Sequence, residues 1–83
     1  MSDNIEQQVR QIVCQVTGLP NDFDPNQHLY LDLGVASVHA LQLLMEIEDK
    51  FGVGIPDEEF VEATSLKQLS EMVQRLVPQG SSN

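Results

Sequence analysis

The sequence has little material for covalent cross-links or an aromatic core, with one cysteine, no tryptophan, three Phe and one Tyr in 83 residues. Cys14 alone can form neither an intrachain disulfide nor a cysteine metal cluster, which fits a reducing compartment. The chain shows no apolar run typical of a signal peptide or a membrane span, so we expect a cytoplasmic protein. A chain of this length makes one domain, with a core mainly of Leu, Ile and Val.

Positive charge is also scarce. Four Lys and Arg residues stand against 13 Asp and Glu residues, which gives a formal net charge of −9. A nucleic-acid-binding protein needs the opposite sign of charge to contact phosphates, so we expect no nucleic-acid partner. The acidity either attracts basic proteins or serves only solubility, and composition alone leaves both interpretations open.

Apolar residues recur at helical spacing in several segments, and no long alternating run indicates a sheet. The pattern therefore predicts an all-α fold, a four-helix bundle with a long loop between the first and second helices and a short third helix. The predicted helices span residues 5–17, 37–51, 57–62 and a fourth segment that starts at Thr64 or Ser65 and ends at Pro78.

Residues 18–35 form the long loop, because Pro20, Pro25 and Gly34 interrupt any sustained period. A loop of this length in a compact domain often carries function. Three alternating leucines are expected to pin it to the core: Leu29, Leu31 and Leu33.

The last two helices carry start signals. Asp57 can cap the short helix, and Ser65 with Gln68 matches a capping box at the start of the fourth. We assign residues 1–77 to the folded domain and expect residues 78–83 to be a disordered tail, since they are polar.

The helix at 37–51 carries more apolar surface than packing on one side requires. On a helical wheel, one apolar group faces the core, and Val38, Leu41 and Met45 form a second group about 140° away. A centrally placed helix would bury both groups, whereas an exposed second group would form a surface for partner proteins. The core-facing group contains Ala40, Leu43, Leu44, Ile47 and Phe51.

Ser37 stands at the start of this helix. A serine there is most often an N-cap, whose hydroxyl accepts a hydrogen bond from a free backbone N–H. The surrounding Gly-Val-Ala-Ser-Val sequence does not match the G-x-S-x-G turn of serine hydrolases, so we predict no catalytic residue. A helix start also favours phosphate groups, so Ser37 is well placed to carry a phosphodiester.

The combined spacing resembles the acyl carrier proteins of the phosphopantetheine-binding family, from about residue 5 to residue 77. The resemblance implies a four-helix bundle in which Ser37 is esterified by a 4′-phosphopantetheine arm that holds acyl groups as thioesters. The residues that carry it are Leu31-Asp32-Leu33-Gly34 before Ser37, then Leu41, Leu44, Glu48, Phe51, Ile55-Pro56 and Thr64-Ser65.

The resemblance also implies partners. A phosphopantetheinyl transferase would modify Ser37 with coenzyme A and magnesium, and acyl-loading and acyl-processing enzymes would then bind the second helix. The chain would be a monomeric carrier rather than an enzyme, with no resident metal. The expected partner-binding residues are Val38, Leu41, Met45 and Glu48.

The chain departs from the family pattern near Ser37. Ala36 and Val38 flank the serine where Asp and Leu are common, and His39 and Gln42 stand where fatty-acid carriers tend to have acids. Fewer acids should weaken attraction to basic patches on general fatty-acid enzymes. We interpret this as a specialised carrier for polyketide, peptide or modified-lipid assembly, although a fatty-acid pathway stays open.

Three other functions compare less well with the sequence: an interaction domain, a calcium-binding loop and an enzyme. An unmodified helical interaction domain would use the Val38, Leu41 and Met45 face and keep Ser37 as a cap. A calcium-binding loop is not predicted. Polar residues stand at alternate positions from Asp22 onward, but the Gly and Glu that such a loop requires at its sixth and twelfth positions are missing. For an enzyme, the spacing of the residues lets no acid, base and nucleophile be assigned together. Cys14 is expected to be a partly exposed, ordinary thiol. The two histidines are expected to be solvated: His28 and His39.

Overall fold

The computed structural model describes residues 4–77, and within that range it confirms the predicted all-helical bundle. The tail predicted for 78–83 lies outside the described residues. None of the described helices is long and apolar enough to cross a membrane. The four helices are α1 (Asn4–Thr17), α2 (Val38–Phe51), α3 (Asp57–Glu62) and α4 (Leu66–Leu76).

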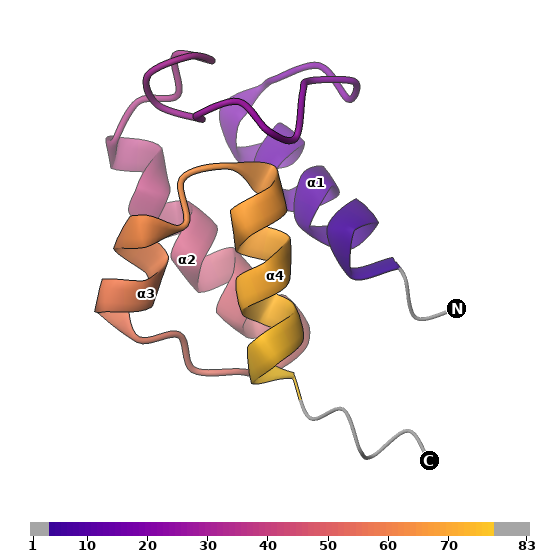
Figure 1. The fold of residues 1–83 in the computed structure, drawn as a ribbon, viewed down its shortest axis with the longest axis vertical. Coiled ribbons are helices and arrows are strands. Elements are labelled where there is room, and N and C mark those ends of the chain that lie inside the picture. The colour runs from indigo at the N-terminus through magenta and orange to yellow at the C-terminus, as the bar shows by residue number, and fades with distance from the viewer. Residues whose placement is uncertain (1–3, 78–83) are drawn as a thin grey trace.

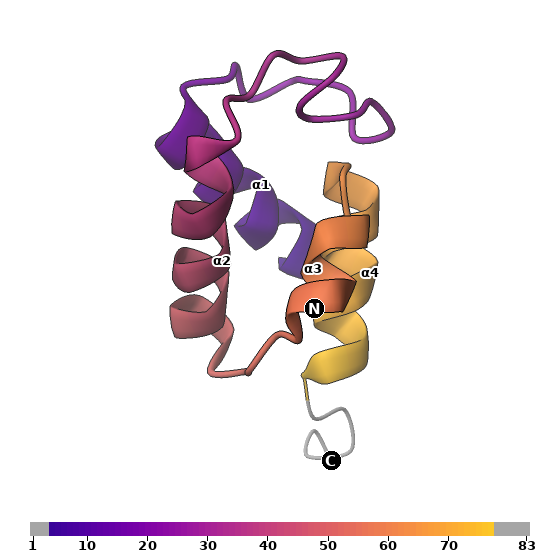
Figure 2. The same ribbon diagram turned by 90° about the vertical axis from the view of Figure 1, so that its left-hand side faces the viewer.

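Figures 1 and 2 show the arrangement of these elements. α1 packs against both α2 and α4, and the short α3 packs against α4. α2 and α4 run in the same direction, and the long loop between α1 and α2 crosses the end of the bundle from which both start. The loop therefore covers the end of the molecule that carries Ser37.

The core is made of the apolar stripes that the sequence predicts. Nine side chains are almost completely buried, and four of them belong to α4. Burying each such side chain stabilises the fold by about 1.5–3 kcal/mol. The nine are Leu29, Leu43, Ile47, Leu66, Leu69, Met72, Val9, Val13 and Val73.

The long loop is fastened to the helices at both of its halves. The Arg10 guanidinium of α1 donates to the carbonyl oxygens of Asn21 (2.6 Å) and Phe23 (2.9 Å) and lies 4.7 Å from the Phe23 ring centre. Toward α4, the Leu29 N–H donates to the Thr64 carbonyl at 2.8 Å, and the Pro25 carbonyl accepts from a backbone N–H in the first turn of α4 at 3.0 Å. These contacts fix the loop from which α2 emerges.

The expectation that three alternating leucines pin the loop is wrong for Leu31, whose side chain is 82% exposed. Leu29 is completely buried and Leu33 is half-buried against the core. The chain turns here instead of extending, because the His28 carbonyl accepts hydrogen bonds from the N–H groups of both Asp32 (2.9 Å) and Leu33 (3.0 Å). A turn removes the two-residue period on which the expectation depended.

The same turn corrects the expectation for His28, which is half-buried rather than solvated. Its Nδ1 accepts hydrogen bonds from the N–H groups of Tyr30 (3.2 Å) and Leu31 (3.0 Å). Its own N–H donates to the Asp32 carboxylate at 2.9 Å. Nδ1 of His28 is thus the shared acceptor that holds the turn together.

The start signals of the last two helices have different outcomes. Ser65 is confirmed as the N-cap of α4, since its hydroxyl oxygen accepts from the Gln68 N–H at 3.2 Å. The Gln68 side-chain carbonyl accepts in return from the Thr64 N–H at 3.0 Å. Asp57 is not a cap: it is the first residue of α3, and Pro56 holds the preceding position. Proline suits that boundary for two reasons: its ring fixes φ, and it has no backbone N–H that would need a hydrogen-bond partner.

Candidate functional site

The site begins with the turn that leads into α2. Gly34 has a φ of 76°, in the left-handed region that an L side chain enters only with strain. No atom lies within 4 Å of where a Cβ would stand, so the backbone conformation and not space requires glycine here. The next residue, Val35, is buried and donates from its N–H to the Leu29 carbonyl at 2.9 Å. The turn thus holds the following residues at the surface.

Ser37 is the first of the predicted site residues, and it lies exposed at the N-cap of α2. Its backbone is already helical, with φ −63° and ψ −22°, and its hydroxyl makes no capping hydrogen bond. A cap residue normally has an extended backbone that turns its side chain toward the first free N–H groups. Ser37 therefore stands at the N-cap position without making the capping hydrogen bond, and its hydroxyl is available for chemistry.

The surroundings of Ser37 fit a phosphodiester. A helix start offers backbone N–H groups and a positive dipole end to an anion. The first turn of α2 contains no acidic residue that would repel the phosphate. Gly34 and Ala36, which precede Ser37, are small and exposed, and this leaves the hydroxyl open to a modifying enzyme.

The second apolar group of α2 is exposed. The exposed fractions are 75% for Val38, 63% for Leu41 and 59% for Met45, whereas Leu43 and Ile47 on the other side are completely buried. α2 thus does not bury both groups, because α1 and the core cover only one side of it. Three large apolar side chains in one row leave a surface that another protein can cover.

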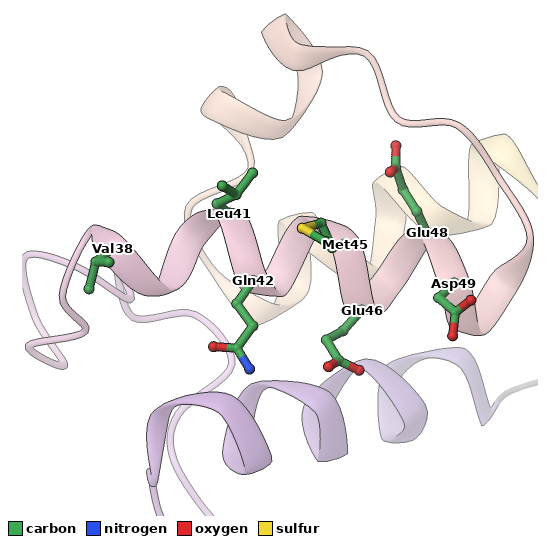
Figure 3. Close-up of a pocket in the computed structure, with 7 residues that line it drawn as sticks. All are labelled: Val38, Leu41, Gln42, Met45, Glu46, Glu48 and Asp49. Carbon is green, nitrogen blue, oxygen red and sulfur yellow. The ribbon is translucent and has the colours of Figure 1, made fainter.

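Figure 3 shows the directions in which the side chains on this face of α2 point. Gln42 and Glu46 point toward α1, whereas Leu41 and Glu48 point to the opposite side. All seven side chains that line the groove drawn there belong to α2, so it is a shallow furrow along a helix face and not an enclosed cavity.

Glu48, the fourth expected partner-binding residue, has a contact within the fold. One oxygen of its carboxylate accepts from the Ile55 N–H at 2.8 Å, across the turn that ends α2. Gly52 makes this turn with a φ of 66° and donates from its N–H to the Glu48 carbonyl at 2.8 Å. Glu48 therefore joins α2 to the segment before α3, and it is also one of the residues that line the furrow.

A comparison with known families agrees with this geometry. Residues 7–73 match the family described as "Phosphopantetheine attachment site". The match spans far more than half of the chain and includes the turn, Ser37, α2 and most of α4. The chain belongs to this family of phosphopantetheine-carrying proteins. Its members bear 4′-phosphopantetheine, joined covalently to a serine, and generally act as non-catalytic carriers of that arm.

Charge divides the exposed face of this carrier into two halves. Near Ser37, the exposed side chains Val38, Leu41 and Gln42 are uncharged. One to two turns further along α2, Glu46 and Asp49 are exposed acids. A partner that contacts the first half of this helix face meets apolar and neutral side chains, and the acids of this face that could pair with a cation of the partner lie further along α2.

His39 differs from its expectation. It is half-buried, and its Nδ1 is buried without a hydrogen-bond partner among the described residues. A buried polar atom without a hydrogen-bond partner costs free energy, so packing and not a polar contact holds the imidazole there. The helical wheel places this residue on a polar sector, but it does not report how closely neighbouring segments approach.

Cys14 is half-buried, as expected, and is not activated. Its Sγ lies 3.7 Å from the Pro20 carbonyl oxygen and 3.6 Å from Asn21 Oδ1. Burial raises the pKa of the Cys14 thiol above its ordinary value, and the positive charge of Arg10 offsets only part of this. The thiol therefore stays protonated at neutral pH, which disfavours a nucleophilic role.

One feature beside Ser37 was not anticipated from the sequence. Ser37 shares a recess of about 220 Å³ with four other residues from three segments of the chain. A possible signal in the sequence is Val61, an apolar residue that interrupts the acids of the short α3 and is 70% exposed. The four residues are Tyr30, Ala40, Phe60 and Val61.

Proposed function

We propose that this protein is an acyl carrier whose arm is attached at Ser37. The observation that carries the proposal is the exposed Ser37 hydroxyl, which stands at the start of a long helix and makes no capping hydrogen bond, in a chain of the phosphopantetheine family. The Ser37 hydroxyl makes no capping hydrogen bond that would stabilise α2, whereas the hydroxyl of Ser65, the N-cap of α4, accepts one from the Gln68 N–H.

In the attachment reaction, Ser37 supplies the hydroxyl oxygen that forms the new bond to phosphorus. The donor is coenzyme A: its pyrophosphate P–O bond breaks, adenosine 3′,5′-bisphosphate leaves, and the serine proton passes to a base of the transferase. The α2 start contributes N–H groups and its dipole to the phosphodiester that remains on the chain. When attached, the arm supplies a terminal thiol that holds an acyl group as a thioester.

The outer face of α2 supports docking of the enzymes that act on such an acyl group. Val38, Leu41 and Met45 provide apolar area, and Met adapts to differently shaped partners. Complete burial of each would contribute about 1.5–3 kcal/mol at most. This scale suits binding that is specific enough to orient the carrier but weak enough to exchange one enzyme for the next.

The attachment is tested by intact-mass spectrometry. The purified chain is incubated with a broad-specificity phosphopantetheinyl transferase, coenzyme A and magnesium, beside a Ser37→Ala variant. We expect one added phosphopantetheine on the native chain and none on Ser37→Ala, with the same circular-dichroism spectrum for both. An unmodified native chain, with an active transferase in the same assay, would instead favour an interaction domain without an arm.

The neutral first half of the α2 face supports a specialised pathway instead of general fatty-acid synthesis. The test adds an acid where such carriers often have one, as Gln42→Glu, and compares turnover by housekeeping fatty-acid enzymes with the native carrier. The control is Gln7→Glu, which adds the same charge on an exposed position of α1. We expect only Gln42→Glu to improve turnover. A native carrier that already equals a fatty-acid carrier contradicts the specialised pathway.

A further inference from the structure

His28 is the residue on which the turn in the long loop closes. Its N–H donates to the Asp32 carboxylate at 2.9 Å, and its carbonyl accepts from the N–H groups of Asp32 and Leu33. Its ring nitrogen Nδ1 accepts from the N–H groups of Tyr30 at 3.2 Å and Leu31 at 3.0 Å. The imidazole thus takes the place that the side chain of Asn, Asp, Ser or Thr usually takes in a capped turn.

Histidine differs from these usual capping residues because its charge changes between pH 5 and pH 8. A proton on Nδ1 makes this nitrogen a donor, so it can no longer accept from an N–H group. Turning the ring over does not help, because its Cδ2–H group then faces the same two N–H groups. A doubly protonated His28 therefore offers Tyr30 and Leu31 no acceptor in either orientation.

The charged groups around His28 do not replace the lost acceptor. The imidazole borders a polar recess of about 450 Å³, which gives protons access to it. Asp32 lines this recess from the turn, and Lys67 and Glu71 line it from α4. The Tyr30 ring centre lies 5.8 Å from that of His28, and burial raises the pKa of Tyr30, so this ring carries no charge between pH 5 and pH 8. Attraction of an imidazolium to either carboxylate makes protonation easier and still leaves the two N–H groups unpaired.

The turn is joined to the entry into α2. Leu29, which directly follows His28, donates from its N–H to the Thr64 carbonyl at 2.8 Å. The Leu29 carbonyl accepts from the Val35 N–H at 2.9 Å, and Val35 lies two residues before Ser37. Loosening of the turn at His28 therefore reaches the residues that present the serine.

We propose that His28 is a proton-sensitive cap that positions Ser37, so that acid loosens the turn and makes the chain a poorer substrate for the transferase. The sign follows from the contacts. The closed turn needs an Nδ1 without a proton, so the open turn binds the proton more tightly and is favoured as the pH falls. His28 is a positioning residue that acts through the turn. Its effect on modification rests on the proposed attachment at Ser37, whereas its effect on the turn does not.

The first test is a nuclear magnetic resonance titration of the chain without an arm, between about pH 8 and pH 5. We expect the amide signals of Tyr30, Leu31 and Val35 to move with the same midpoint as the His28 ring signals. The hydrogen-exchange protection of the Tyr30 and Leu31 amides should fall about two- to tenfold toward the acid end. His28→Asn keeps an acceptor for an N–H two residues further on and binds no proton in this range, so it should fold and abolish the titration.

Two controls separate His28 from the other groups that change charge. His39→Asn makes the same substitution at the second histidine and should leave the movement of the three amides unchanged. Asp32→Asn removes the carboxylate that accepts from the His28 N–H and should shift the midpoint without abolishing the movement. Amides that titrate equally in His28→Asn, or that stay still while the His28 ring titrates, would overturn the inference.

The second test is the rate of arm attachment, measured where the transferase stays active on His28→Asn. We expect the rate of the native chain relative to His28→Asn to fall at least about twofold from pH 7.5 to pH 5.5. The rate of His39→Asn relative to the native chain should stay constant. A constant ratio for His28→Asn as well, with titrating amides, would overturn the positioning of Ser37. A chain that gains no arm at any pH removes the proposed function, and the amide titration still decides the effect on the turn.

Discussion

α2 and α4 start at the same end of the bundle, and both follow a serine at the N-cap. At α4 the fold uses this serine completely: Ser65 is only 7% exposed, and its hydroxyl closes a hydrogen-bonded start with Gln68. At α2 the serine is exposed and its hydroxyl makes no such bond. The two positions share residue type and place in the helix but differ in backbone conformation, which is helical at Ser37 (φ −63°, ψ −22°) and extended at Ser65 (φ −130°, ψ 163°).

The sides of the two helices differ in the same way. In the part of the chain that the structure describes, no large apolar side chain of α4 is exposed, because its apolar residues pack into the core. α2 is buried on one side and leaves Val38, Leu41 and Met45 exposed on another. α4 thus leaves no apolar row exposed, whereas α2 leaves one that the proposed docking of partner enzymes would use.

The largest expected effect separates the two serines by function. Ser37→Ala should abolish modification by the transferase completely, while changing the free energy of unfolding by less than about 0.5 kcal/mol, as expected of an exposed position without contacts. Intact mass and urea unfolding measure the two quantities on the same samples. A loss of stability as large as that of Ser65→Ala would show that Ser37 is a working cap and would remove the contrast.

The next effect separates the two sides of α2. Leu43→Ala removes a completely buried side chain and should lower the free energy of unfolding by about 2–5 kcal/mol. Met45→Ala, two residues further along, should change it by less than about 0.5 kcal/mol and instead weaken binding to an acyl-processing enzyme. Urea unfolding and a binding titration check both. Equal destabilisation by the two variants would mean that the Met45 row is packed in solution.

A smaller effect concerns the start of α4. Ser65→Ala should cost about 0.5–2 kcal/mol of stability, because the Gln68 N–H loses its acceptor. Modification at Ser37 should proceed at the native rate when the variant is folded. The double variant with Gln68→Ala should cost less than the sum of the single ones, since both residues belong to one hydrogen-bonded unit. Simple additivity, measured by thermal and urea unfolding, would contradict the capping box.

The smallest effect concerns the loop that leads to α2. His28→Leu removes the acceptor of two backbone N–H groups and should cost about 0.5–1.5 kcal/mol, because both N–H groups stay partly accessible to water. His28→Asn should recover part of this, since an Asn side chain can accept from an N–H two residues further on. Backbone amide shifts of Tyr30 and Leu31 report the turn directly. Indistinguishable spectra and stabilities for the Leu and Asn variants would contradict the acceptor role.

Helical periodicity and capping signals predicted most of this fold. The predicted bounds of the first three helices differ from the observed ones by at most one residue, and the Ser65 and Gln68 pair was correct. These features depend on local sequence, so they can be read without knowledge of distant contacts. The Leu31 expectation failed because alternation in a short loop does not distinguish an extended strand from a turn closed by hydrogen bonds.

The site was predicted less completely. Ser37 and the second apolar group of α2 were identified, but the sequence left the burial of that group open, because burial depends on where α1 and α3 lie. The recess with Tyr30, Phe60 and Val61 was missed, since three segments distant in sequence form it. The contact of Glu48 with the Ile55 N–H was missed for a similar reason: it requires the left-handed turn at Gly52.

The two backbone hydrogen bonds between the long loop and the start of α4 also bear on how the protein reaches its native state. They join parts of the chain that are far apart in sequence, so they close a large loop of chain and form only after that entropy has been lost. The turn that presents Ser37 cannot be held until the loop has docked on α4. We therefore expect a chain whose loop has not docked to be a poor substrate for the transferase, so that modification would select chains that have completed folding.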